Sequence, residues 1–432
     1  KLRASDIKRI ADTFIKRESV TKFSRVVSRE EIRSNDYNLN IPRYVDSSEA
    51  AEHWDVYASM FGGIPTAEID EMSEFWTAFP ALKKALFTES GIPYVNVSTP
   101  DIKSAIKSHP DVVGFENAFN AAFSTFPAFL KEELIDRMGS IEISKAETVL
   151  SADIFERLKD IPLIDKYAAF QLLDDDWTGI SIDLEVLQTE GFSATKEVDP
   201  NLVIKKKDGK DQEVQEGWVG HIIPFDLVQA TLLSTETDEL HGLESRLAEI
   251  PSEYESILDE MTEEDKESCN DVLTEEGDAF VPKEVSKKIK ELKKDRSPES
   301  VALRILLEKV ESLVKSEKEI KAEIKAKSAA LQAKTKDTIE SLSDEQALNL
   351  LEKKWIAPLI ESIHKLPDTV IDSLVSKIQA LQNKYATTFF EVEQQISETE
   401  ATLSGMIDDL EGNEYDMLGL NELKKLLGGS AE

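Results

Sequence analysis

The sequence predicts a mainly α protein with small β elements, an α+β chain in which helices dominate. Three observations support this class. Two long runs of apolar residues at heptad spacing predict a coiled coil, a stretch rich in Phe and Trp at helical spacing predicts a helical domain, and an Asp-Gly turn between alternating segments predicts a β-hairpin. A chain of 432 residues with 41% hydrophobic content is long enough to bury several cores.

Residues 1–46 are expected to close a sheet whose other strands lie outside this sequence. A short helix carries apolar residues on one face (Ile7, Ile10, Phe14), and the alternating segment KFSRVVS over 22–28 predicts a strand. Ser28 then begins a second short helix, with Glu31 as its capping-box partner. The segment NDYNLNI alternates polar and apolar residues and stops at Pro42, as a strand does.

Residues 47–164 are expected to form an aromatic-rich helical domain. A Gly-Gly turn in FGGIP precedes a helix that carries Phe75, Trp76 and Phe79 on one face. Their spacing of three and four positions favours a packed helical core over a cofactor site. The Gly-Gly turn is not a cofactor loop either, because Ile-Pro follows it instead of a helix that opens after a strand.

Residues 165–233 are expected to form a small α+β unit. A helix over 166–177 precedes two strand-like segments, 201–206 and 215–223, which the Asp208-Gly209 turn joins. The hairpin tip is rich in lysine, and these side chains are candidates for contact with a phosphate backbone: Lys205, Lys206, Lys207 and Lys210. A solvated hairpin tip is the alternative interpretation.

Residues 234–283 predict an acidic helical linker, and residues 284–432 predict a coiled-coil hairpin with a tail. Its two arms, 301–331 and 374–410, carry the heptad runs and are expected to pack on each other antiparallel. Some apolar residues fall outside the seams and are candidates for contact with a partner subunit: Ile305, Leu307, Val375 and Ile407. Self-dimerisation of two hairpins is the competing use of that surface.

Charge is distributed unevenly along the chain. The net charge is −34, which argues against a surface that binds nucleic acid over its whole area. Residues 1–43, however, contain 11 basic residues against 6 acidic ones, whereas residues 234–281 contain 2 against 17. We therefore expect DNA to approach the amino-terminal end and to be repelled by the acidic segment.

Several functional classes lack their motifs. The five histidines are isolated from one another and Cys269 is the single cysteine, so we expect no metal site and no intramolecular disulfide. No P-loop and no Gly-x-Ser-x-Gly motif occurs. No segment is long and apolar enough to span a bilayer, and we expect a cytoplasmic protein with no membrane contact.

The segment NDYNLN followed by RYVD resembles the end of the catalytic domain in the modification (M) subunit of type I restriction-modification systems, an adenine-N6 DNA methyltransferase family. Further segments resemble the longer members: FGGIP, FWTAFPALKKALF, PLIDKYAAFQLLDDDW, IKKKDGK, WVGHIIPFDLV and the Lys354-Trp355 pair. The catalytic Asn/Asp-Pro-Pro-aromatic tetrad and the Phe-x-Gly-x-Gly loop do not occur. Because the chain starts at Lys1, we expect it to be the carboxy-terminal part of a larger subunit that does not methylate alone.

The resemblance implies that the parent subunit flips an adenine out of the duplex and methylates its N6 with S-adenosylmethionine. Because this chain lacks both motifs, we assign no catalytic or cofactor-binding residue to it. It implies a specificity (S) subunit, a restriction subunit and DNA as partners. The basic start then contributes candidates for contact with DNA: Lys22, Arg25, Arg29, Asn35, Tyr37, Asn38, Asn40 and Arg43.

Three alternatives remain open. The polar residues among these candidates could cap turns while Tyr37, Leu39 and Ile41 finish the sheet. The chain could instead be a coiled-coil scaffold or adaptor without a link to DNA, or a self-contained enzyme of unknown type. NDYNLNIPRYVD and the basic start argue against the scaffold, and the missing nucleophile, metal and phosphate motifs argue against the enzyme.

Overall fold

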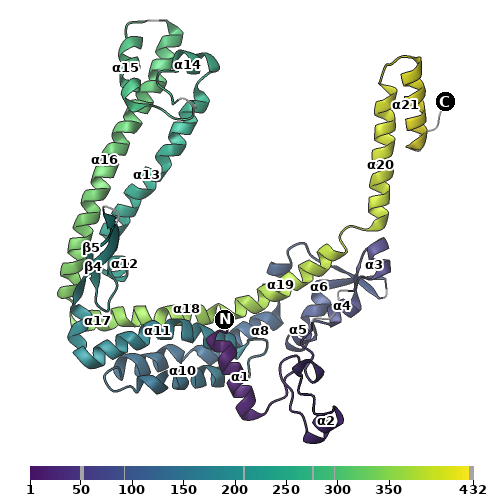
Figure 1. Cartoon of the computed structure of the whole chain (residues 1–432), viewed down its shortest axis with the longest axis vertical. Coiled ribbons are helices and arrows are strands. Elements are labelled where there is room, and N and C mark those ends of the chain that lie inside the picture. The colour runs from purple at the N-terminus through teal and green to yellow at the C-terminus, as the bar shows by residue number, and fades with distance from the viewer. Residues whose placement is uncertain (49–52, 92, 208–209, 275–276, 296, 428–432) are drawn as a thin grey trace. The chain divides into compact units, whose positions relative to one another are not determined.

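The computed structural model describes residues 1–48, 53–91, 93–207, 210–274, 277–295 and 297–427 (Figure 1). The chain forms two compact units, each built from segments that are not consecutive in the sequence. The first comprises Lys1–Glu132, Glu142–Gly179 and Pro358–Glu432, and the second comprises Glu133–Ile141 and Ile180–Ala357. Helices make up most of both units, which confirms the mainly α class with small β elements. Within the described residues, no helix combines the length and the apolar content needed to cross a membrane.

The first unit surrounds one small antiparallel sheet with helices. The strands lie in the order β1 (Ile64–Pro65), β3 (Tyr94–Val97), β2 (Phe87–Gly91). Its helices are α1 (Ala4–Lys16), α2 (Arg29–Ser34), α3 (Val56–Phe61), α4 (Thr66–Asp70), α5 (Ser73–Ala78), α6 (Leu82–Leu86), α7 (Ile102–Lys107), α8 (Pro110–Phe123), α9 (Phe126–Leu130), α10 (Ile143–Leu158), α18 (Ala357–His364), α19 (Leu366–Lys384), α20 (Phe389–Asp408) and α21 (Glu414–Leu426), with a 3-10 turn η1 (Ile41–Arg43). The helix α11 (Lys166–Glu190) and the π-helical turn η2 (Lys131–Asp136) contribute residues to both units, and the first residue of α18 belongs to the second unit.

One apolar core joins the aromatic helices of the first unit to α19. Phe75 and Phe79 are buried, as a helical core requires, and they share a cluster with Leu374 and Ile378 of α19. The predicted helix is interrupted between α4 and α5, yet its apolar face still points inward. The first residues of the second heptad run therefore pack on the aromatic helices.

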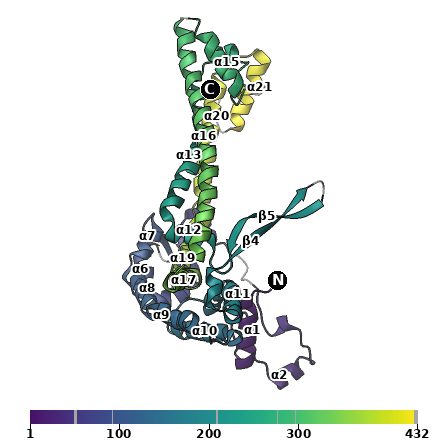
Figure 2. The ribbon, with the colours of Figure 1, turned by 90° about the vertical axis from the view of Figure 1, so that its left-hand side faces the viewer.

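The second unit combines a β-hairpin with long helices. Strands β4 (Val198–Lys207) and β5 (Lys210–Gly220) pair antiparallel, which confirms the predicted hairpin; its Asp208-Gly209 turn lies outside the described residues. Figure 2 shows the two strands side by side. The helices are α12 (Phe225–Leu232), α13 (Ser234–Glu260), α14 (Glu263–Ser268), α15 (Pro282–Leu292), α16 (Pro298–Glu340) and α17 (Asp344–Leu351), with a 3-10 turn η3 (Phe192–Lys196) and a π-helical turn η4 (Glu352–Ile356).

The first heptad run, which lies in α16, packs against α13. The expected antiparallel pairing of the two heptad runs with each other was therefore wrong. Leu303, Leu307 and Val310 of α16 are buried in a cluster with Ile257 of α13 and Val285 of α15. Ion pairs fix the antiparallel direction of α13 and α16: Lys309 with Glu260, Lys327 with Glu239, and Lys334 with Glu236. The acidic segment, expected to be a linker, thus supplies a helix whose charge complements the lysines of α16.

Neither predicted strand forms within residues 1–48. In the 22–28 segment, Lys22 adopts a left-handed conformation (φ 60°), and only an isolated bridge between Val20 and Ser24 remains. In NDYNLNI, Asp36 and Tyr37 are left-handed as well (φ 53° and 58°), which breaks an extended backbone. The alternating pattern was misleading here, because a strand needs a neighbouring strand, and no described strand pairs with this segment.

Candidate nucleic-acid interface

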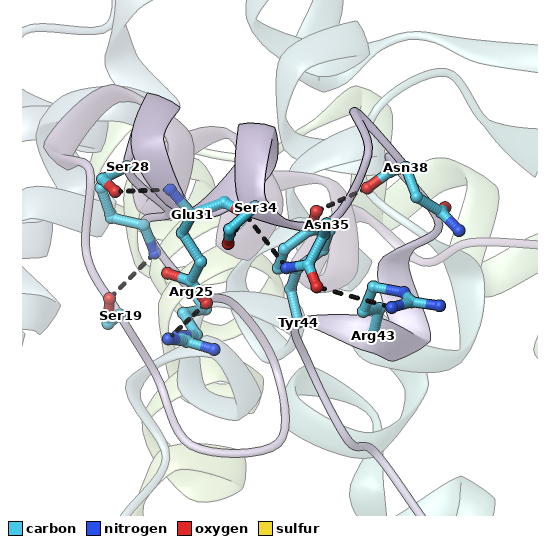
Figure 3. Close-up of polar contacts among 10 residues, drawn as sticks. Ser19, Arg25, Ser28, Glu31, Ser34, Asn35, Asn38, Arg43 and Tyr44 are labelled. Atoms are coloured by element: carbon cyan, nitrogen blue, oxygen red, sulfur yellow. Dashed lines mark hydrogen bonds and ion pairs between the residues drawn. The ribbon is translucent and has the colours of Figure 1, made fainter.

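The loop after α1 is held by its own hydroxyl groups (Figure 3). Ser19 Oγ accepts a hydrogen bond from Val26 N at 3.0 Å, and Ser28 Oγ accepts one from Glu31 N at 3.1 Å. Ser28 therefore caps α2, but the predicted capping box is only half formed: among the described contacts, the Glu31 carboxylate does not accept from Ser28 N. The carboxylate of Glu31, however, pairs with Arg25 at 2.9 Å, so Arg25 is already partly neutralised.

The asparagines of NDYNLN stabilise turns. Asn35 Nδ2 donates to Glu31 O at 3.1 Å, and Asn35 Oδ1 accepts from Arg43 Nη1 at 3.5 Å. Asn38 Oδ1 accepts from Asn40 N at 2.9 Å, and the Tyr44 hydroxyl donates to Asn38 O at 2.5 Å. The Asn35 and Asn38 side chains thus have a structural use, as the turn-capping alternative requires.

The aromatic and basic candidates are more accessible. Tyr37 is exposed, and its hydroxyl accepts from Arg33 Nε at 3.2 Å. Lys22, Arg29 and Arg43 are exposed on the same segment. Asp46 lies at its end, where hydrogen bonds from Ser48, and to a smaller extent the charge of Lys22, lower the pKa of the carboxyl group. Lys22, Arg29 and Arg43 are the candidates best placed to contact phosphate.

Only part of the lysine-rich hairpin tip lies within the described residues. Lys206 is exposed but lies opposite Asp211 on the neighbouring strand. The side chains of Lys205, Lys207 and Lys210 lie outside the described residues. At the base of the hairpin, Lys336 Nζ of α16 lies 3.8 Å from the centre of the Trp218 ring.

Helix α1 packs in an unusual orientation, with its polar face inward. Ser5 and Thr13 are buried, and Ser5 N donates to Gln171 Oε1 of α11 at 3.0 Å. Lys8 Nζ lies 5.3 Å from the centres of two rings, those of Phe155 and Phe170. The face predicted from Ile7, Ile10 and Phe14 is the exposed one.

The exposed apolar face of α1 is extensive. The side chains are 56% exposed at Ile7, 48% at Ile10, 82% at Phe14 and 76% at Ile15. Together with Phe23 and Val26 of the following loop, Ile10 and Phe14 line one hollow. An apolar surface of this kind normally marks an interaction site.

The four candidate interface residues lie in different environments. Ile305 is 49% exposed, whereas Leu307 and Val375 are buried in the cores of their own units. Ile407 is also buried, next to Asp408, which pairs with Lys424 of α21. Only Ile305 among them is exposed enough to contact a partner directly.

The sequence did not indicate a polar cluster in the first unit that involves α3, α4 and α19. Glu68 accepts hydrogen bonds from Lys384 Nζ at 2.8 Å and from the Tyr385 hydroxyl, and the same hydroxyl accepts from Asp55 N at 3.1 Å. Because Lys384 and Tyr385 lie hundreds of positions from Asp55 and Glu68, no local pattern connects the two pairs. Within the described part of the chain, no group of three or more His, Cys, Asp or Glu residues is arranged to hold a metal ion.

Comparison with known proteins identifies the segment that carries α1 and the NDYNLN turn. Residues 1–53 match the family model described as N-6 DNA Methylase. The match is confined to these residues, which are a small part of the chain. Over 56 residues, the chain is also 45% identical to the methylase subunit of the type I restriction enzyme MjaVII from Methanocaldococcus jannaschii. The aligned part covers 13% of this chain and 10% of that subunit, and no solved structure matches the chain.

The resemblance to an N-6 DNA methylase of a type I system is therefore confirmed for the amino-terminal segment. The later segments of the resemblance, from FGGIP to Lys354-Trp355, lie outside the family-model match and remain predictions. Residues 1–53 (the N-6 methylase segment) contain the exposed apolar face of α1 and all candidate DNA contacts except the hairpin lysines.

Proposed function

We propose that this chain is the carboxy-terminal portion of the M subunit of a type I restriction-modification DNA methyltransferase. The observation that carries the proposal is the outward apolar face of α1 within the N-6 methylase segment. Burying one Ile or Phe side chain stabilises a fold by about 1.5–3 kcal/mol. Leaving four such side chains exposed is therefore unfavourable unless another structure covers them. The rest of the catalytic domain is the covering structure that we propose.

The methyl transfer belongs to that catalytic domain in this proposal. The Gly62-Gly63 turn packs against its own sheet, since a Cβ at Gly63 would lie 3.2 Å from Tyr94 Cβ. We assign no catalytic residue to this chain. S-adenosylmethionine is bound by the parent subunit, which methylates the N6 of adenine.

The basic loop after α1 positions DNA in the parent enzyme. Lys22, Arg29 and Arg43 are exposed and lie in the segment that adjoins the proposed catalytic domain. Side chains of this kind contact phosphates and set the register of a duplex without reading its bases. Sequence choice then belongs to a specificity subunit, with the restriction subunit as a further partner. The DNA substrate implies a cytoplasmic location.

Aspartate substitutions at Ile10 and Phe14 test the proposal. In this chain alone, Ile10→Asp with Phe14→Asp should leave the thermal unfolding midpoint unchanged, because both side chains already contact water. In the whole M subunit, the same double variant should lose stability and adenine-N6 methylation of DNA, measured with S-adenosylmethionine and the specificity subunit present.

The matched control is Lys16→Asp, which also changes charge on α1 at an exposed position. It should affect neither protein. Full methylation and full stability of the whole subunit with Ile10→Asp and Phe14→Asp would refute the proposed covering of α1.

A further inference from the structure

Residues 385–388 interrupt a helix at a point where the sequence has no helix breaker. Helix α19 ends at Lys384, and α20 begins at Phe389. The chain contains neither glycine nor proline between Pro367 and Gly405. The heptad seam of the sequence also passes through the break, by steps of four and three positions: Leu374, Ile378, Leu381, Tyr385, Thr388 and Val392. One continuous helix would therefore carry all these side chains on the same face.

The start of the break is fixed by contacts with distant parts of the first unit. The Tyr385 hydroxyl donates to the carboxylate of Glu68 and accepts from Asp55 N at 3.1 Å. Lys384 Nζ donates to the other oxygen of that carboxylate at 2.8 Å. Tyr385 is buried, and the side chains of Lys384 and Glu68 are only 12% and 17% exposed, so water competes little for these bonds. We call Asp55, Glu68, Lys384 and Tyr385 the latch.

The end of the break is held by a helix cap and by the turn after α3. Thr388 Oγ1 accepts from Glu391 N at 3.1 Å, which caps α20 and is a local signal for a new helix. A Cβ at Gly62 would lie 3.3 Å from Thr388 Cγ2, so the turn packs against this residue. Within α20, which the structure describes completely, only Ser404 and Ile407 are buried, and both lie toward its far end. The first turns of α20 therefore remain exposed although α3 contacts this helix.

Breaking a helix has a cost that the local sequence offsets only in part. The last carbonyl groups of α19 and the first N–H groups of α20 lose their helical partners, and the Thr388 side chain satisfies one of these groups. In an unbroken helix they bond to one another. The bend is thus favoured by the cap and by the latch, and the contacts of the latch lie outside both helices.

We propose that residues 385–388 are a hinge with two states. In the bent state the latch is closed, and α20 starts as a separate helix after Thr388. In the straight state the latch is open, and α19 continues into α20 as one helix. Because Lys424 of α21 pairs with Asp408 of α20 at 2.7 Å, these two helices move together when the hinge opens.

The hinge is a conformational device that other molecules can bias. A ligand that bonds to Glu68, or that binds the straight helix more tightly, shifts the population toward the straight state. The proposal rests on contacts within the first unit, and it does not depend on the proposed methylase function.

Pulsed electron paramagnetic resonance on the full chain measures the two states. Gln379→Cys on α19 and Ser397→Cys on α20 carry nitroxide labels at exposed positions, and Cys269→Ser removes the native thiol. The label positions are 18 residues apart. A straight helix places them on one face and about 27 Å apart along its axis. The bent state gives a shorter distance.

Opening the latch should populate the longer distance. Glu68→Ala with Tyr385→Phe removes the acceptor of Lys384 and the hydroxyl group but keeps the aromatic ring. The ratio of long to short distances should rise by about tenfold or more. The matched control is Asp70→Ala, which removes a carboxylate from the same helix that pairs with Lys83 instead. This variant should keep the distances of the wild-type chain.

A further variant, Phe389→Pro, separates hinge motion from unfolding. Proline suits the first residue of α20, because Thr388 before it is already extended (φ −90°, ψ 154°) and Phe389 is exposed. In the straight state the same proline lies inside the helix, which it breaks. Added to the open-latch variant, it should restore the short distance. Circular dichroism checks that each variant keeps its helices.

Three results would overturn the proposal. If the open-latch variant keeps the short distance, the local cap alone holds the bend. If Phe389→Pro leaves the long distance in place, that distance comes from unfolding of the unit. If Asp70→Ala produces the long distance to the same extent, the latch has no special role.

Discussion

Trp355 donates its indole N–H to the carboxylate of Asp183 across 2.7 Å, and both side chains are buried in the second unit. The same carboxylate oxygen accepts from Lys354 Nζ at 2.5 Å, and Lys354 Nζ also donates to Ile222 O at 2.6 Å. The Lys354-Trp355 pair of the sequence resemblance therefore has a structural role: it connects η4 to α11 and to the end of the hairpin.

Asp183→Leu should destabilise the second unit. The change removes the acceptor of two donors, one of which is a charged ammonium group that remains partly buried, and we expect a loss of about 2–3 kcal/mol in the free energy of unfolding. Urea denaturation followed by tryptophan fluorescence measures it. Asp344→Leu is the control, because Asp344 pairs with Lys196 at the surface and should contribute less than about 1 kcal/mol. Equal losses for both variants would show that burial of Asp183 does not matter.

Ile305→Asp and Leu307→Asp should differ sharply although the residues are two positions apart on α16. Leu307 is fully buried against α13 and α15, so an aspartate there should cost more than about 3 kcal/mol. Ile305 is half exposed, and its replacement should change the free energy of unfolding by less than about 1 kcal/mol. Thermal unfolding of the two variants measures both losses, and similar losses would contradict the prediction. The same reasoning predicts that Val375→Asp destabilises the first unit, because Val375 is buried.

Charge reversal should separate the basic residues of the amino-terminal loop. In the whole subunit assembled with its specificity subunit, Lys22→Glu and Arg29→Glu should weaken DNA binding and reduce the salt slope by about one per lost phosphate contact. Arg25→Glu should have a smaller effect, because Arg25 already pairs with Glu31. Fluorescence anisotropy at several salt concentrations gives both quantities. If all three variants keep the wild-type slope, this loop does not contact DNA.

His221 should make the stability of the second unit depend on pH. Its hydrogen bond to Asp199 at 2.6 Å, assisted by Glu190, raises the pKa of the imidazole above 6.5. A raised pKa in the folded state means that the protonated form stabilises the fold. This stabilisation is complete below about pH 6.5 and is lost as the pH rises through the folded-state pKa. The temperature midpoint of unfolding should therefore decrease as the pH is raised from about 6 to about 8. In the His221→Gln variant, the part of this decrease that is due to His221 should be absent.

The sequence by itself determined the elements whose physical cause is local. The heptad run of α16, the apolar face of the helices that carry Phe75 and Phe79, the cap at Ser28 and the β4–β5 hairpin all follow from spacing and turn chemistry, and each is present. The amino-terminal segment could also be recognised, because NDYNLN and RYVD form a specific pattern.

Only the tertiary structure decided which partner each apolar or charged face has. The heptad spacing of α16 predicted that it needs a partner helix, but the ion pairs of Lys327 and Lys334 with glutamates of α13 decide which one. The alternation in NDYNLNI predicted a strand, yet a strand requires a neighbour, and Tyr37 is instead left-handed in a turn. Likewise, the sequence predicted that α1 has an apolar face but not whether that face is buried. Ser5 and Thr13 on the other face are buried against the first unit, so the apolar face is exposed. Local patterns fix periodicity, whereas pairing depends on residues distant in the sequence.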